Sequence, residues 1–252
     1  MKKQNLLFSL LLLGMGIGLF SCNIGNGGNI TKFPTTPAVI NSNTDIFEIA
    51  IGTQWGYCAA PSLESYEGSC AILSFAIDFD NQPPSLNYSY TASAINISEI
   101  VPQRSLEMAY DSVHIDDYML PISSAAYVSS PFYNGKIFMG IASKDNNPNF
   151  RLVFNMQEPD SAGIKNLYLL AQPSSSSAVD IAKNYAFDVL SLIQYYGRDT
   201  TITDNNGTLS YRYVKANLKY FTGMSKDEVP VPTYNTLNNI NNPLIFLIFN
   251  NQ

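Results

Sequence analysis

The chain has few of the histidine, cysteine and charged residues from which most metal sites and charged-ligand sites are built. It contains one histidine, three cysteines and one tryptophan, and only 13% of its 252 residues are charged, compared with about 25% in an average soluble domain. It has no run of basic residues, and its formal net charge is −6. This composition argues against nucleic acid or anionic lipid headgroups as partners. Solubility must come from Asn, Ser and Thr.

Catalytic motifs are equally scarce. The string G-x-S-x-G of many serine hydrolases does not occur, and twenty acidic residues can always supply a carboxylate pair, so their presence does not indicate a glycosidase. His114 stands among Asp111, Asp116 and Asp117, a cluster that could hold a divalent cation or pair a base with its orienting carboxylate. Without a second histidine, an acidic, solvated turn is the simpler interpretation. We therefore assign no catalytic residue, metal or cofactor, and an enzyme is not favoured.

The N-terminus is the most informative segment. Lys2 and Lys3 precede an apolar run over residues 6–20, and a cysteine, Cys22, follows directly. A spanning helix needs about 20 apolar residues, so an uncleaved transmembrane helix is the weaker alternative. The pattern predicts a lipoprotein signal peptide over residues 1–21, with Cys22 as the lipid-modified first residue of the mature chain.

The rest of the chain has the pattern of a mostly β protein, an antiparallel sandwich or barrel built as two subdomains. A Gly-, Asn-, Thr- and Pro-rich stretch over residues 22–43 predicts a flexible tether. We expect an N-terminal β subdomain over 44–102 and a C-terminal β-sandwich-like domain over 103–252. Short apolar segments separated by turn residues predict strands, at 46–51, 71–79, 88–97, 135–142, 150–156, 164–171, 208–220 and 244–249. The strands at 135–142, 150–156 and 164–171 are expected to be consecutive and antiparallel.

Two segments are less regular. Residues 179–196 fit either a helical face or an alternating strand, and we favour a strand at 186–192. In the run 208–220 the apolar alternation changes parity, which predicts a β-bulge near Tyr213. The six consecutive apolar residues at 244–249 predict a central or sandwich-core strand.

Two cysteines remain once Cys22 is assigned to lipid. Cys58 and Cys70 are separated by eleven residues, and in an exported chain such a pair is most simply a disulfide, which would stabilise the fold by on the order of 3 kcal/mol. A metal or redox pair is the alternative, but neither a nearby histidine nor a C-x-x-C motif supports it.

Aromatic residues are the more plausible binding material. Trp55 and Tyr57 flank Gly56 and could stack on a sugar or a peptide. Core packing is the competing explanation for a lone tryptophan in a β domain.

The signal, the Gly/Asn tether and the β-rich body resemble exported lipoproteins of Bacteroidota. Within that group, the segments 111–118, 133–139, 187–190 and 214–221 resemble the NigD-like lipoproteins, which pair a small barrel-like domain with a C-terminal β-sandwich. The resemblance lies in the order and composition of these segments, and the region around Cys58 and Cys70 does not share it. It implies an accessory or binding role without catalytic residues.

Three Asp-Ser/Thr-small strings are similar to the O-glycosylation sequon of that phylum and make candidates of Ser112, Ser161 and Thr200. The residues after Cys22 lack the charged run that directs such lipoproteins to the cell surface. We therefore expect an outer-membrane anchor that faces the periplasm.

Three functions follow from these observations. The first is a lipid-anchored, non-enzymatic binding or structural module for a neutral glycan or a protein partner. The second is an exported hydrolase acting on glycan or peptide. The third is a fimbria-like or adhesin subunit, in which residues 244–249 would pair with a neighbouring chain.

Overall fold

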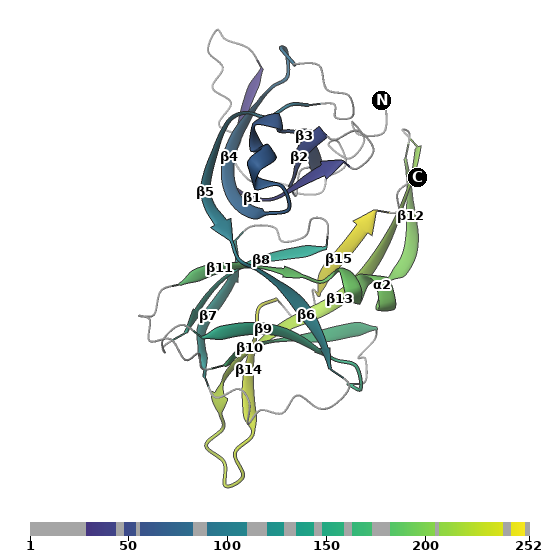
Figure 1. The fold of residues 1–252 in the computed structure, drawn as a ribbon. Coiled ribbons are helices and arrows are strands. Elements are labelled where there is room, and N and C mark those ends of the chain that lie inside the picture. The colour runs from purple at the N-terminus through teal and green to yellow at the C-terminus, as the bar shows by residue number, and fades with distance from the viewer. Residues whose placement is uncertain are drawn as a thin grey trace. The chain divides into compact units, whose positions relative to one another are not determined.

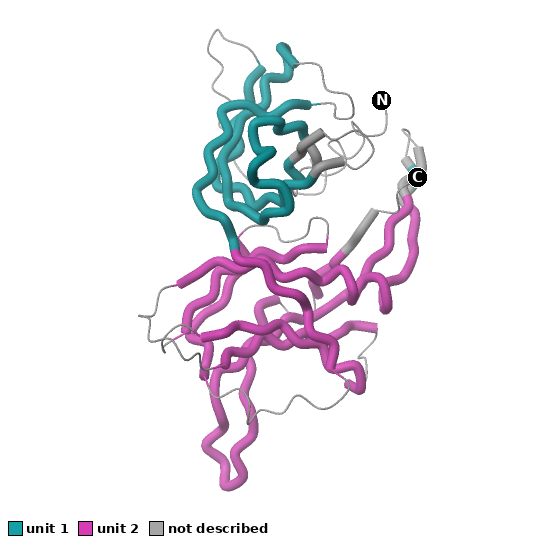
Figure 2. Tube along the Cα trace, in the orientation of Figure 1, with its two compact units in different colours: residues 1–101, 202–209 teal, residues 102–201, 210–252 magenta. Residues whose placement is uncertain are grey.

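The structure is a computed structural model that is mostly β, as the sequence predicts. The chain divides into two compact units, unit 1 (residues 1–101 and 202–209) and unit 2 (residues 102–201 and 210–252) (Figure 2). The described residues are 29–43, 48–53, 56–82, 90–109, 120–128, 135–143, 148–158, 163–172, 182–204, 207–238 and 243–249.

Unit 1 contains a five-stranded sheet in the order β3-β2-β1-β4-β5 (Figure 1). Neighbouring strands in this order are antiparallel. A short 3₁₀ helix, η1, lies between β3 and β4 in the sequence. The elements are β1 Ile30–Asn43, β2 Glu48–Thr53, β3 Gly56–Ala59, η1 Pro61–Tyr66, β4 Cys70–Asp78 and β5 Ser93–Val101.

This sheet curls into a partly closed barrel. The long strand β1 pairs with β4 over its first part and with β2 over its last part, and a register shift between Phe33 and Thr36 interrupts it. The two edges of the sheet also meet: Ala59 of β3 forms a parallel bridge with Thr91, just before β5. The strand order, the bridge and the helical turn after β3 together match the OB-fold, a five-stranded, partly open Greek-key barrel.

The core of unit 1 follows from alternation along β4. Ala71, Leu73, Phe75 and Ile77 are buried in one cluster, as expected for residues two apart on a strand. The β4 segment is thus the strand that the sequence predicts at 71–79. Leu63 of η1 joins the same cluster.

The predicted tether at 22–43 is wrong for residues 30–43, which form β1. The composition is polar, but Phe33 and the run from Ala38 to Ile40 are buried, and β1 pairs with β4 up to Val39 and with β2 from Ala38 onward. Pro34 and Pro37 fit here because β1 has only β4 as a partner before Ala38, and because Pro34 lies in the register shift between Phe33 and Thr36. Residues 22–28 lie outside the described residues.

The predicted disulfide is also wrong, because no bond joins Cys58 and Cys70 in the structure. The register places β2 and β1 between them: Cys58 pairs with Ile51 of β2, and Cys70 with Val39 of β1. Cys58 lies in the barrel core with Ala71, and alternation turns the neighbouring Cys70 to the opposite face of β4. A disulfide needs Cβ atoms about 4 Å apart, which this arrangement excludes.

The second sheet has ten strands in the order β12-β13-β10-β9-β6-β11-β8-β7, with β14 and β15 also paired to β13. It is mixed, because β6–β9, β6–β11 and β10–β13 are parallel. The strands are β6 Gln103–Ala109, β7 Ile122–Tyr127, β8 Lys136–Ser143, β9 Asn149–Asn155, β10 Ile164–Gln172, β11 Lys183–Asp188, β12 Arg198–Asp204, β13 Gly207–Met224, β14 Pro232–Thr236 and β15 Leu244–Phe249.

The expectation of three consecutive antiparallel strands is confirmed only for β9 and β10, which are antiparallel neighbours. The strand before them, β8, instead pairs with β7 and β11. Strands β6 and β11 lie between β9 and β8 in the sheet, so β8 and β9 are not neighbours.

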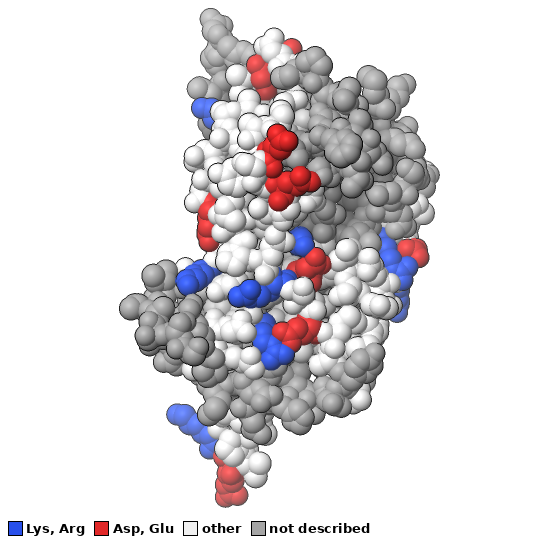
Figure 3. Space-filling model, in the orientation of Figure 1, with Lys and Arg blue, Asp and Glu red and all other residues white. Residues whose placement is uncertain are grey.

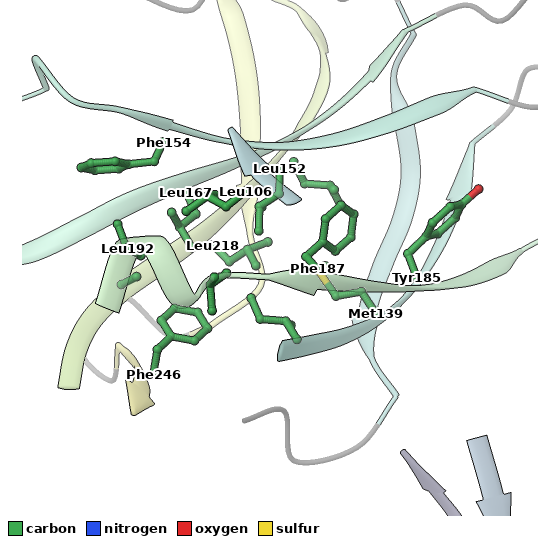
Figure 4. Close-up of a cluster of buried hydrophobic side chains, with 14 of the residues drawn as sticks. Leu106, Met139, Leu152, Phe154, Leu167, Tyr185, Phe187, Leu192, Leu218 and Phe246 are labelled. Atoms are coloured by element: carbon green, nitrogen blue, oxygen red, sulfur yellow. The ribbon is translucent and has the colours of Figure 1, made fainter. Parts of the chain in front are cut away.

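One main core fills unit 2. Its buried side chains come from opposite parts of the sheet order, for example Ile122 of β7 and Val214 of β13, so the sheet folds back over itself. Figure 4 shows Phe187 of β11 and Leu218 of β13 pointing into the same interior, with Phe246 beside them.

Residues 186–192 are not one strand. β11 ends at Asp188, and a short helix, α2, runs from Leu190 to Tyr196. The Asp188 carboxylate accepts a hydrogen bond of 2.9 Å from the Leu190 N–H, satisfying one of the free N–H groups of the first turn. At the other end, Arg212 Nε donates to the Ile193 carbonyl over 3.0 Å.

The predicted bulge near Tyr213 is absent from the pairing of β13 with β15. The register advances one residue at a time from Tyr211↔Phe249 to Ala216↔Leu244. The apolar pattern changes parity because Tyr211 and Tyr213 lie on the face of β13 opposite to the core residues Val214 and Ala216. The irregularity of β13 lies further on, between Phe221 and Gly223 against β14.

Candidate functional site

A group of polar and aromatic side chains lies on one face of unit 2. On β10, Leu167 and Leu169 enter the main core, so alternation turns Asn166 and Tyr168 to the other side. β9, β13 and β14 contribute in the same way. We call this surface the outer face. Besides Asn166 and Tyr168 it comprises Arg151, Val153, Asn155, Leu170, Lys215, Asn217, Lys219, Phe221 and Tyr234, with Glu107 of β6 at its edge.

A small apolar cluster supports the outer face. Val153, Leu170 and Phe221 are buried there, and the rings of Tyr168 and Tyr234 pack against them. The two tyrosine rings meet edge to face with centroids 5.1 Å apart, the geometry that aromatic pairs prefer. The tyrosines are therefore held in place while remaining partly exposed.

Glu158 fixes the polar groups next to these rings. The Tyr168 hydroxyl donates to its carboxylate, 2.9 Å from each oxygen, and Asn166 Nδ2 donates to Oε1 over 2.7 Å. Burial raises the pKa of Tyr168, and the hydrogen bond and charge of Glu158 raise it further. On the other flank, Lys219 Nζ lies 5.3 Å from the centre of the Tyr168 ring, within cation–π range.

Asparagines form a row across three strands. Asn166 pairs in register with Asn217 of β13, and the β9–β10 register places Asn155 on its other side. Asn155 Oδ1 accepts from the Gln157 N–H over 2.9 Å, and Asn217 Oδ1 accepts from Asn238 Nδ2 over 2.8 Å. We call Asn155, Asn166 and Asn217 the amide row.

The charges of the outer face nearly balance, with the basic Arg151, Lys215 and Lys219 against the acidic Glu107 and Glu158. Arg151 binds Glu107 through two parallel hydrogen bonds, a geometry that favours guanidinium over ammonium. Lys219 and Glu158 contact Tyr168 from different sides. On the face of the molecule shown in Figure 3, acidic and basic side chains likewise lie next to one another over unit 2.

Most residues proposed from the sequence lie outside the described residues: Cys22, Trp55, Ser112, His114 and Ser161, with the three aspartates around His114. For Tyr57 only the backbone is described, on β3, where it pairs with Gly52. Thr200 lies on β12 and is half-buried, and the preceding Asp199 forms an ion pair with Arg212. The structure thus brings none of these candidates together.

The outer face was missed by the sequence reasoning. A signal was available: residues 166–170 alternate Asn-Leu-Tyr-Leu-Leu, and residues 215–221 alternate Lys, Asn, Lys and Phe against Ala and Leu. What the sequence does not show is that these two segments are parallel neighbours.

Two negative findings concern the described residues alone. They contain no group of three or more His, Cys, Asp or Glu side chains placed to hold a metal ion. None of their helices has the length and apolar character needed to cross a bilayer.

Comparisons with known proteins identify a fold. No family model matches the sequence, and no curated protein matches it. Among solved structures, an uncharacterized protein from Parabacteroides merdae is similar over 86% of this chain and 99% of its own, with a TM-score of 0.55 and 16% identity.

Two weaker matches also come from Bacteroidales. A protein of unknown function from Bacteroides vulgatus has a TM-score of 0.44, and a NigD-like immunity protein from Bacteroides caccae has a TM-score of 0.41; each is 12% identical. Each covers 83% of this chain, and the chain covers 92% and 93% of theirs, respectively. The similarity to the Parabacteroides merdae protein shows the fold of this chain.

Proposed function

We propose that this chain is a lipid-anchored protein of the cell envelope with a non-enzymatic binding or accessory role. The observation that carries the binding role is the outer face of unit 2, where ordered rings and amides stand partly exposed and the acidic and basic side chains nearly balance. The lipid anchor rests on the signal pattern before Cys22. The anchor would hold the protein at the outer membrane, facing the periplasm.

The anchor is tested by detergent phase partitioning of the native protein against Cys22→Ala. The wild-type chain is expected in the detergent phase, and the variant in the aqueous phase or retained as precursor. Protease added to intact cells should leave a periplasm-facing protein uncut and degrade a surface-displayed one. A wild-type protein that stays aqueous would contradict the anchor.

The non-enzymatic role is tested by incubating the purified protein with glycans and peptides and measuring new reducing ends or new amines. We expect neither. Turnover that disappears in His114→Ala would establish the hydrolase instead.

The adhesin alternative is less well supported. β15 pairs with β13 of its own chain, and Phe246 is 1% exposed in the main core. A strand whose side chain completes its own fold is a poor donor to a neighbouring molecule.

A further inference from the structure

We propose that the outer face binds a neutral oligosaccharide and that the amide row is the element that contacts its hydroxyl groups. This inference rests on the proposed binding role and names its ligand class. The observation that carries it is that each asparagine of the row uses one of its amide atoms in a hydrogen bond within the protein and leaves the other unused.

Each asparagine of the row uses one side of its amide within the described residues. Asn155 and Asn217 accept through Oδ1, which leaves Nδ2 as a donor. Asn166 donates through Nδ2, which leaves Oδ1 as an acceptor. The unused atoms therefore alternate donor, acceptor, donor across β9, β10 and β13, and a sugar hydroxyl can both donate and accept.

The spacing of the row suits an extended glycan. Neighbouring strands lie about 4.8 Å apart, so the three amides repeat at a distance comparable to the length of one sugar ring. A chain of sugars lying across the strands would present hydroxyls to successive asparagines.

The row is also preorganised. The Glu158 carboxylate fixes the orientation of Asn166 and is itself held by Tyr168. Asn238 orients Asn217 and accepts in turn from the Leu218 N–H over 3.0 Å. Because these side chains are already ordered, a ligand loses less free energy in fixing them.

The charge pattern favours a neutral ligand over an acidic or basic one. Glu107 neutralises Arg151, and Glu158 and Lys219 both contact Tyr168. With Lys215, the outer face carries three basic and two acidic side chains, a net charge of only +1. A peptide is disfavoured, because extended peptides commonly dock by main-chain pairing at a sheet edge, whereas the outer face presents side chains. The adjoining Tyr234 adds an aromatic ring, which packs against the apolar face of a sugar.

The test is calorimetric titration of the full mature chain with neutral hexasaccharides of glucose, mannose, galactose or xylose. Oligogalacturonate and an unstructured peptide serve as the acidic-glycan and peptide probes. The key variant is Asn217→Asp, which keeps the oxygen that Asn238 binds but replaces the free donor by a charged acceptor. We expect at least one neutral hexasaccharide to bind, and Asn217→Asp to weaken it tenfold or more.

Asn235→Asp is the matched control. Asn235 lies on β14 next to Tyr234, so its side chain is on the other side of the strand, where it contacts the Tyr220 hydroxyl. This variant carries the same charge change and should bind like the wild type. A second variant, Tyr234→Leu, should also weaken binding, with circular dichroism confirming that it folds.

The proposal is overturned if no neutral hexasaccharide binds, if only oligogalacturonate or the peptide binds, or if Asn217→Asp and Asn235→Asp have equal effects. Phase partitioning of the same preparations distinguishes failure of the glycan proposal from failure of the proposed function. A chain that remains anchored through Cys22 and binds the peptide alone would refute the glycan while leaving the proposed function standing.

Discussion

Replacing Gly197 by alanine should destabilise unit 2 although the backbone there is ordinary. Gly197 follows α2, with φ −67°, so an alanine is not strained by its dihedral angles. Its Cβ would overlap the Ile193 carbonyl oxygen and lie 2.7 Å from Arg212 Cγ. These atoms belong to the contact that joins α2 to β13, because Arg212 Nε donates to that carbonyl.

The magnitude follows from three contributions. Overpacking of this kind costs about 1–3 kcal/mol, and loss of the Arg212 hydrogen bond adds about 1 kcal/mol. The lower entropy of the unfolded chain with alanine offsets about 0.4–1 kcal/mol. The net loss of unfolding free energy is about 2 kcal/mol, which lowers Tm by about 4–8 °C for a chain of this size.

Calorimetric unfolding of Gly197→Ala beside Gly140→Ala checks the reasoning. At Gly140, on β8, the added Cβ meets only the Asn184 side-chain oxygen, at 3.2 Å, which has to shift by only a few tenths of an ångström. Gly140→Ala should therefore change stability by less than about 0.5 kcal/mol, and the gain in strand propensity makes it neutral or slightly stabilising. Equal Tm values for the two variants would refute the assigned contact.

Three further predictions concern single groups. Burial raises the pKa of Cys58 to about 12, and Cys70 is fully buried, so iodoacetamide at pH 8 should modify neither thiol in the folded protein and both after denaturation without reductant; denatured protein that needs reductant first would reveal a disulfide. The Asn81 side chain is the main cause that lowers the pKa of Asp78, assisted by two backbone N–H groups. The stability that Asp78 contributes is therefore present above its ordinary pKa of 3.8 and lost as the pH falls through the lowered value; Asn81→Ala should raise this pKa in an NMR titration, and an unchanged value would show that the backbone groups suffice. Mass spectrometry of protein from the native host should find a glycan on at least one of the three sequon residues, Ser112, Ser161 and Thr200. If all three are unmodified, the assignment is rejected.

Local patterns predicted the strands well where one face is buried against a core. β4 and β9 follow apolar alternation or a short apolar run, and their bounds agree closely with the segments expected at 71–79 and 150–156. β1 was missed because its apolar residues are few and lie among Thr and Pro, so that only pairing with β2 and β4 makes it a strand.

Non-local relations could not be predicted. The separation of Cys58 from Cys70 depends on β1 and β2 lying between β3 and β4, which no spacing of cysteines indicates. The amide row has the same origin: Asn166 and Asn217 are fifty-one residues apart and become neighbours only through the parallel pairing of β10 with β13. The alternation on each strand is readable from the sequence, but their register is not.

The most direct measurement of the central claim is an NMR titration of the mature chain with the best-binding neutral hexasaccharide, following the side-chain amide signals of asparagine and the indole signal of Trp55. We expect the signals of Asn155, Asn166 and Asn217 to shift together as the sugar concentration rises, while the signal of Asn235 stays unchanged. Shifts confined to the Trp55 indole would place the ligand on unit 1 and contradict the assignment of the outer face.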